Sequence, residues 1–158
     1  MPRSAEAETA NPGIARPPLV YLVAIVAGVL LAFAWPLPFV SEVLSKPLGG
    51  VIVLVAIALF IASTGRFRAA GTPVPGNRPT TTIVHTGPYR FSRNPIYLAF
   101  SLLQLGIAIW VDDAWLIATL LVAMALMTWV VIRREERYLE AKFGAEYVDY
   151  KANVRRWI

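Results

Sequence analysis

The sequence predicts an all-α integral membrane protein: a four-helix bundle whose last span extends into the cytoplasm and is followed by a short C-terminal helix. Of the 158 residues, 57% are hydrophobic, and the mean hydropathy is +0.57. A soluble domain of this length is rarely so apolar. Four apolar stretches follow one another along the chain, and the basic residues alternate between its loops. Four such stretches in one short chain favour a membrane bundle over a soluble one.

Prolines mark where the apolar stretches begin and end. Pro17 and Pro18 precede the first stretch, Pro47 precedes the second, and the third begins at Pro95. Each stretch is close to the ~20 residues that cross ~30 Å of hydrocarbon. The predicted spans are residues 19–35, 48–64, 95–111 and 114–132.

Two segments outside the spans lack a helical pattern. Residues 1–18 are polar and proline-rich, and we expect them to form a disordered cytoplasmic arm rather than a signal peptide. The middle loop, Gly65 to Asn94, is rich in proline, glycine and threonine, and loops of about thirty residues are commonly functional or disordered. No repeat or second domain is visible, so residues 19–158 are predicted to form a single domain.

The distribution of basic residues predicts the orientation of the spans. Lys46 is the only basic residue between the first two spans, and none lies between the third and the fourth. The middle loop and the segment after the fourth span carry most of the others. By the positive-inside rule, the middle loop and both termini are cytoplasmic.

The same composition narrows the possible partners. The net charge of +5 is explained by membrane topology, so no nucleic-acid partner is predicted. The chain has no cysteine and one histidine, His85. Thiolate chemistry and multi-histidine metal centres are therefore excluded, and no metal is expected.

The last span is predicted to continue as a helix beyond the membrane. Residues 133–143 are good helix formers, and Gly144 is a typical C-terminal stop. A helix from Trp115 to Phe143 would be about 43 Å long, about two turns longer than the bilayer core. Residues 145–153 should form a short helix folded back beneath the bundle, with residues 155–157 at the lipid boundary.

Two polar motifs should meet at the cytoplasmic edge of the bundle. Asn94-Pro95 suits a helix start, with Asn94 as the cap, and Asp113 can cap the fourth span. Glu135 and Glu136 would lie about 30 Å along the last helix, at the depth where Tyr97 begins the third span. Polar and acidic groups are costly at a membrane edge and usually mark a site.

These motifs resemble the superfamily of isoprenylcysteine carboxyl methyltransferases and phospholipid methyltransferases, which are integral membrane enzymes. The resemblance rests on G87-P-Y-R-F-S-R-N-P-I-Y97 and on E135-E-x-x-L-x-x-x-F-G-x-x-Y-x-x-Y150, and it extends from Thr82 to Arg156. It implies S-adenosylmethionine as the cofactor. It also implies methyl transfer at the cytoplasmic face to a lipidic or small apolar acceptor from the bilayer.

The resemblance also implies the site residues, within residues 78–97 and 133–158. Glu135 and Arg134 are the candidate catalytic residues, because an amine acceptor needs a base whereas a carboxylate acceptor needs none. Arg93 or Arg134 would meet the cofactor carboxylate. The candidate cofactor-binding residues are His85, Gly87, Pro88, Tyr89, Arg93, Asn94, Tyr97, Glu135 and Glu136.

Departures from the family pattern leave the acceptor open. Asn94 stands where the family often has histidine, and Ala99 where it often has glycine. The acceptor could be a phospholipid amine, an isoprenyl-type thioether carboxylate or a small apolar thiol. Two other functions remain: a sterol-type membrane reductase that uses NADPH, and a non-catalytic membrane protein of the same fold.

Overall fold

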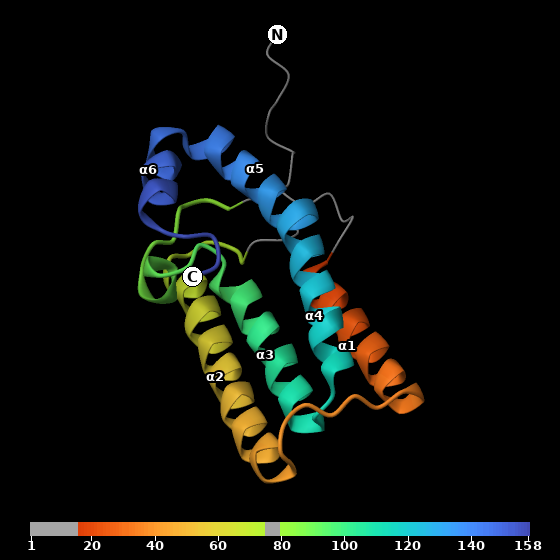
Figure 1. The fold of residues 1–158 in the computed structure, drawn as a ribbon. Helices are drawn as coiled ribbons and strands as arrows, with labels where there is room; N and C mark the ends of the chain where they lie inside the picture. Colours follow the sequence, from red (N-terminus) through yellow and green to blue (C-terminus); the bar gives the residue numbers. More distant parts are fainter. Residues whose placement is uncertain (1–15, 75–79) are drawn as a thin grey trace.

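The computed structural model describes residues 16–74 and 80–158, and in this part of the chain it contains helices and no strand. The predicted fold class is confirmed: four apolar helices form a bundle, and two shorter helices fold over one end of it (Figure 1). The elements are α1 (Pro17–Ala34), α2 (Glu42–Ala69), the 3₁₀ turn η1 (Gly87–Arg90), α3 (Pro95–Val111), α4 (Ala114–Leu126), the π-helical segment η2 (Met127–Ile132), α5 (Arg133–Phe143) and α6 (Ala145–Asn153).

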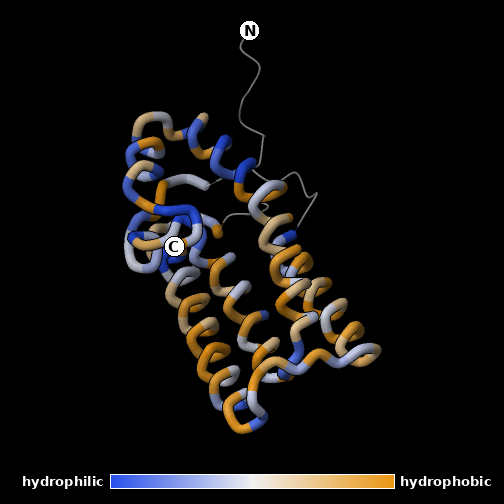
Figure 2. The backbone as a smooth tube through the Cα atoms, in the orientation of Figure 1, coloured by the Kyte–Doolittle hydropathy of each residue, from blue (hydrophilic) through white to orange (hydrophobic). Residues whose placement is uncertain are grey.

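The long helices have the length and surface of membrane spans. Three helices are long and apolar enough to cross a membrane, namely α1, α2 and the continuous helix Ala114–Phe143, and α3 is a shorter apolar helix. Hydrophobic residues run along all four, while hydrophilic residues gather where α5 and α6 lie (Figure 2). The apolar part of the last helix ends at Ile132, and α5 continues beyond it. These are the features of a multi-pass membrane protein.

The spans pack as two pairs, α2 with α3 and α1 with α4 (Figure 1). Small residues allow the close approach within each pair. A Cβ atom on Gly49 of α2 would lie 2.6 Å from the backbone nitrogen of Trp110 in α3. A Cβ atom on Gly28 of α1 would lie 2.8 Å from the Thr119 hydroxyl in α4. Such glycines let helix backbones pack closely in lipid.

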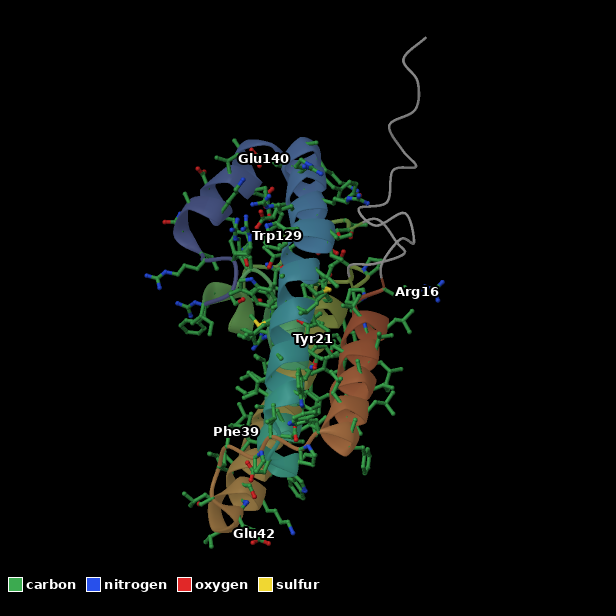
Figure 3. All side chains as sticks on the ribbon, turned by 45° about the vertical axis from the view of Figure 1, so that its right-hand side comes forward. Arg16, Tyr21, Phe39, Glu42, Trp129 and Glu140 are labelled. Carbon is green, nitrogen blue, oxygen red and sulfur yellow. The ribbon has the colours of Figure 1, made fainter. Side chains whose placement is uncertain are left out.

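We call the end of the bundle with η1, α5 and α6 the site end, and the opposite end the far end. In Figure 3, Glu140 lies at the site end, and Phe39 and Glu42 lie at the far end. At the far end, Asp112 accepts hydrogen bonds from the backbone amides of Phe39 (2.9 Å) and Val40 (2.7 Å). Asp113 accepts from the Trp115 amide at 2.9 Å, which confirms its predicted role as the cap of α4.

The bounds of the first two helices differ from the prediction. Pro17 and Pro18 are the first residues of α1, where a missing amide is harmless, so the end of the predicted disordered arm is helical. Residues 1–15 of that arm lie outside the described residues. The second helix begins at Glu42 rather than at residue 48. Pro47 is tolerated because the carbonyl that it leaves without a helical partner belongs to Val43, an 83% exposed residue near the helix start.

The middle loop is also shorter than predicted, because α2 continues to Ala69. Arg66 and Arg68 lie in its last turn, where positive charge favours the helix dipole. The apolar sequence ends at residue 64, but the helix continues to Ala69.

The predicted end of the last helix is confirmed. Gly144 ends α5 with φ of 56°, a backbone conformation that glycine adopts readily, and α6 follows from Ala145 to Asn153. The predicted cap at Asn94 is wrong in its contact, since the Asn94 side chain makes no capping bond. Its Nδ2 instead donates to the carbonyl of Arg156 at 2.9 Å, so Asn94 holds the C-terminal tail.

Candidate functional site

A cavity lies at the site end, where α5 and α6 fold over the ends of α2 and α3. The space between its walls is about 770 Å³, with the open mouth and the solvent in it included. The wall is mainly aromatic and apolar, with three charged side chains. The lining residues are Phe67, Val74, Thr80, Thr82, Ile83, Val84, Tyr89, Arg93, Asn94, Ile96, Tyr97, Glu135, Glu136, Tyr138, Leu139, Tyr147 and Tyr150.

Tyr97 and Glu135 join the two motifs. The Tyr97 hydroxyl donates to Glu135 and lies 2.8 Å and 2.9 Å from its two carboxylate oxygens. Both residues are 6% exposed. The predicted meeting of the motifs at one depth is therefore confirmed.

Glu135 has no basic partner among the described residues. Burial raises the pKa of Glu135 to about 7, with the Tyr97 hydrogen bond opposing this rise and the neighbouring Glu136 adding to it. A carboxyl group with such a pKa changes its protonation state near neutral pH, and perturbed groups of this kind cluster at functional sites.

The neighbouring Glu136 is fully paired. Arg156 donates to its two oxygens at 2.9 Å and 2.7 Å, and Arg93 Nη2 lies 3.1 Å from one of them. Although burial alone would raise the pKa of Glu136, the hydrogen bonds from Arg156 and the charge of Arg93 lower it. Glu136 is therefore a carboxylate that holds two guanidinium groups.

Arg93 lines the cavity with donors that have no hydrogen-bond partner among residues 16–74 and 80–158. Its side chain is 8% exposed, and within these residues its buried Nε and Nη1 atoms make no hydrogen bond. Buried donors of a charged group are costly to leave unsatisfied. An acceptor atom of a ligand in the cavity would satisfy them.

The C-terminal tail closes one side of the cavity. Residues Ser92 and Arg155 form an isolated parallel bridge, and the Arg93 amide donates to the Arg155 carbonyl at 2.9 Å. The Tyr150 hydroxyl donates to the carbonyl of Tyr89 at 2.7 Å. The tail is thus bound at several points to η1 and to the segment that leads into α3.

At the end of this tail, Arg156 and Trp157 contact the bundle, and the predicted position of residues 155–157 at the lipid boundary stays a prediction. Arg156 turns inward to Glu136 because the buried carboxylate offers it a bidentate partner. Trp157 packs against the buried cluster, and its Nε1 lies 3.3 Å from the Thr128 hydroxyl.

Aromatic rings give the cavity its apolar character. Phe67 packs edge-on against Tyr89 with ring centroids 5.2 Å apart, and Tyr147 lies 6.2 Å from Tyr150. Burial raises the pKa of Tyr147 to about 12, and it also raises the pKa values of Tyr89 and Tyr150. These phenols therefore stay neutral at physiological pH.

The structure separates the predicted site residues into two groups. The lining of the cavity includes Tyr89, Arg93, Asn94, Tyr97, Glu135 and Glu136. His85 is exposed, and Arg134 is partly exposed; like Gly87 and Pro88, they lie outside the lining. Gly87 instead shapes the turn. Its φ is 61°, and a Cβ atom added to it would lie only 2.6 Å from Nε of Arg66.

Several lining residues had no assigned role in the cofactor site. Tyr147 and Tyr150 belong to the quoted motif, so their spacing was a signal. Arg156 lies outside the lining but binds Glu136, and no signal in the sequence predicted this pairing because it depends on the path of the tail. The loop residues from Thr80 to Val84 follow no periodicity, and only the fold brings them to the wall.

Comparisons with known proteins agree with this arrangement. The sequence model of the phospholipid methyltransferase family matches residues 44–146, from α2 to the start of α6. The chain is 40% identical to an uncharacterised protein of Haemophilus influenzae over 65 residues. These residues make up 40% of this chain and all of that protein.

Two resistance proteins are similar over a shorter share of their length. The cobalt-zinc-cadmium resistance protein CzcN of Cupriavidus metallidurans is 37% identical over 73 residues, 46% of this chain and 33% of that protein. The nickel-cobalt-cadmium resistance protein NccN of Alcaligenes xylosoxydans xylosoxydans is 37% identical over 73 residues, 46% of this chain and 34% of that protein. The chain thus spans about a third of each resistance protein. No solved structure matches it.

Proposed function

The chain belongs to the phospholipid methyltransferase family, and we propose that it is a membrane methyltransferase that uses S-adenosylmethionine. Its acceptor would be a lipidic or small apolar molecule, either an isoprenylcysteine-type carboxylate or a phospholipid amine. The observation that carries the proposal lies in one aromatic cavity: the described part of the chain offers no partner to two donors of Arg93 and no basic partner to the buried carboxyl group of Glu135.

The charges of the cavity complement those of the cofactor. Arg93 Nε and Nη1, which no described residue binds, would bind the cofactor carboxylate, while Glu136 holds the guanidinium in place from the other side. Glu135 is placed to balance a cationic group of the cofactor. The rings of Tyr89, Tyr147 and Tyr150 are suited to a cation and to adenine. When bound, S-adenosylmethionine supplies an electrophilic methyl group on a sulfonium.

The protein mainly has to align the acceptor and exclude water, because methyl transfer is a single displacement. The tail residues Tyr147 and Tyr150 close the cavity against water. If the acceptor is an amine, Glu135 is the group that takes its proton, and a pKa of about 7 suits a general base. If the acceptor is a carboxylate, no base is required.

We propose that the site end faces the cytoplasm. Arg66 and Arg68 end α2 at this end, and Arg133 and Arg134 begin α5. The residues between α3 and α4 at the far end are acidic, Asp112 and Asp113. This asymmetry follows the positive-inside rule, and both termini would then be cytoplasmic.

Ligand titration tests the proposal. The full chain in nanodiscs would be titrated with S-adenosylmethionine, its demethylated product and NADPH. Binding of the first two, with no binding of NADPH, is expected. Binding of NADPH alone would favour a sterol-type reductase, and binding of none of the three would favour a non-catalytic protein.

Transfer of a labelled methyl group identifies the acceptor. The protein would be incubated with methyl-labelled S-adenosylmethionine and a membrane lipid extract, or with a farnesylcysteine compound. Label in phospholipid headgroups would assign an amine, and base-labile label in the thioether compound would assign a carboxylate ester. Label in neither would contradict the proposed acceptor classes.

A further inference from the structure

The π-helical segment η2 lies directly before the two glutamates of the site. The Arg133 amide bonds to the carbonyl of Thr128, five residues earlier, instead of to the residue four earlier. A π turn therefore takes up one more residue than an α turn, and such turns are found mostly at functional sites. In Figure 3, Trp129 marks this segment near the site end.

The face of α4 that packs into the bundle shows what a regular helix would do. Leu116, Leu120, Ala123 and Met127 are all buried at α-helical spacing. In an unbroken α-helix, Arg134 would lie about five full turns beyond Leu116 and would share this face. Glu135 would be rotated from it by about 100°, and Glu136 by about 200°.

The observed burial is shifted by one residue. Val131 and Ile132 are 3% and 0% exposed, and Glu135 and Glu136 are both 6% exposed. Arg134, which regular spacing would bury, is partly exposed and lies outside the cavity wall. The extra residue in η2 accounts for this shift, because it turns α5 back by about one α-helical residue.

We infer that η2 is the positioning element of the site: its additional residue places Glu135, rather than Arg134, beside Tyr97 on the cavity wall. This inference rests on the proposed function only in the use of S-adenosylmethionine as the probe. The register of the helix, and not the chemistry of the side chains in α5, then determines which of these residues line the cavity.

If this register positions Glu135, removing one residue from η2 and adding one residue to it should have different effects on the site. Deletion of Trp129, which is 61% exposed, would convert η2 into α-helix and leave Met127 and Glu135 on the faces that they now occupy. An alanine inserted after Trp129 would turn α5 by about 100° and bring Arg134 to the place of Glu135. In a regular helix, both changes would displace Glu135 equally.

Calorimetric titration with S-adenosylmethionine tests this asymmetry in the full chain in nanodiscs. The deletion should keep the dissociation constant within about threefold of the unmodified chain, and the insertion should raise it at least about tenfold. Equal losses in both variants would overturn the inference. An unmodified chain that does not bind the cofactor would instead contradict the proposed function.

Cysteine labelling gives a second measurement that needs no cofactor. Because the chain has no cysteine, Arg134→Cys and Glu135→Cys can be compared singly by reaction with an aqueous maleimide. Position 134 should react and position 135 should be protected, both in the unmodified chain and after deletion of Trp129. After the insertion, position 134 should become protected, because Arg134 then takes the place of Glu135, and position 135 should stay protected at the buried place of Glu136. A protected position 134 in the deletion variant, or a reactive one in the insertion variant, would overturn the inference even where cofactor binding is lost for other reasons.

Discussion

The two ends of the bundle each carry a pair of adjacent acidic residues, and the pairs have different surroundings. At the far end, backbone amides satisfy Asp112 and Asp113: Asp112 binds Phe39 and Val40, and Asp113 binds Leu37 at 2.9 Å as well as Trp115. At the site end, Glu136 binds two arginines, whereas the only side chain that binds Glu135 within residues 16–74 and 80–158 is the Tyr97 hydroxyl.

The difference shows how a structural acidic pair is distinguished from a candidate site. The aspartates tie the loop between α1 and α2 to the turn between α3 and α4, and their acceptors are used within the protein. The glutamates line a cavity beside Arg93, two of whose donors have no partner in the described part of the chain. Only the second pair leaves binding capacity for a ligand.

Removal of the tail should have the largest effect on the site. A chain ending at Gly144 loses Tyr147, Tyr150 and the Arg156 partner of Glu136, so methyl transfer should fall at least about a hundredfold. The spans should still insert, because their apolar residues end at Ile132. Methyl-label transfer and protease protection in vesicles measure the two effects.

The matched control for that truncation is a chain without Ile158, which is 75% exposed and should transfer methyl groups normally. Normal turnover by the chain that ends at Gly144 would mean that the tail does not close the cavity.

Arg93→Lys should have the next largest effect. Lysine keeps a positive charge near Glu136 but loses the planar donors that face the cavity, so affinity for S-adenosylmethionine should fall by about 1.5–3 kcal/mol. Arg156→Lys is the matched control, because Arg156 also binds Glu136 but does not line the cavity. Equal losses of affinity in the two variants, measured by calorimetry, would show that cofactor binding does not depend on the cavity-facing donors of Arg93. It would then depend only on the arginines that hold Glu136.

The effect of pH on cofactor binding should be smaller than the effect of Arg93→Lys. Because burial raises the pKa of Glu135 to about 7, the ionised form that attracts a cationic cofactor increases as the pH rises through 7. Affinity should therefore rise between about pH 6 and pH 8 by up to about tenfold. Glu135→Gln should bind with a flat profile over this range. A pH-dependent rise that persists in Glu135→Gln would assign it to another group.

The same pKa predicts the opposite trend for the stability of the free protein. Glu135 holds its proton more tightly when folded, so its contribution to the free energy of unfolding is present below about pH 4.5 and is lost as the pH rises to about 7. Thermal unfolding of Glu135→Gln relative to the unmodified chain checks this sign.

Local chemistry made some of these features predictable from the sequence. Pro95 and Gly144 define helix ends through their own backbone preferences, so α3 and the end of α5 agree with the prediction. That Tyr97 and Glu135 lie at one depth followed from helix length and membrane thickness alone. The bounds of α2, Glu42 and Ala69, did not follow, because hydropathy indicates lipid contact and not helix formation.

The remaining site residues depend on long-range geometry. Arg134 was predicted at the site as a partner for the cofactor carboxylate, and the apolar residues of η2 give no sign of the π turn that brings Glu135 there instead. The pairing of Arg156 was not predicted, because its partner, Glu136, lies 20 residues away along the chain. The positions of both arginine side chains depend on the path of the backbone, which no local sequence pattern gives.

The most direct test compares the two acidic pairs by one substitution each. S-adenosylmethionine binding would be measured by calorimetry in nanodiscs for the unmodified chain, Glu135→Gln and Asp113→Asn. We predict that Glu135→Gln binds more than ~1 kcal/mol more weakly, the scale of a hydrogen bond to a charged group. Asp113→Asn should be less stable to heat, with an unchanged dissociation constant for the folded protein. Unchanged affinity in Glu135→Gln, or affinity lost only in Asp113→Asn, would contradict the assignment of the site to the glutamate end.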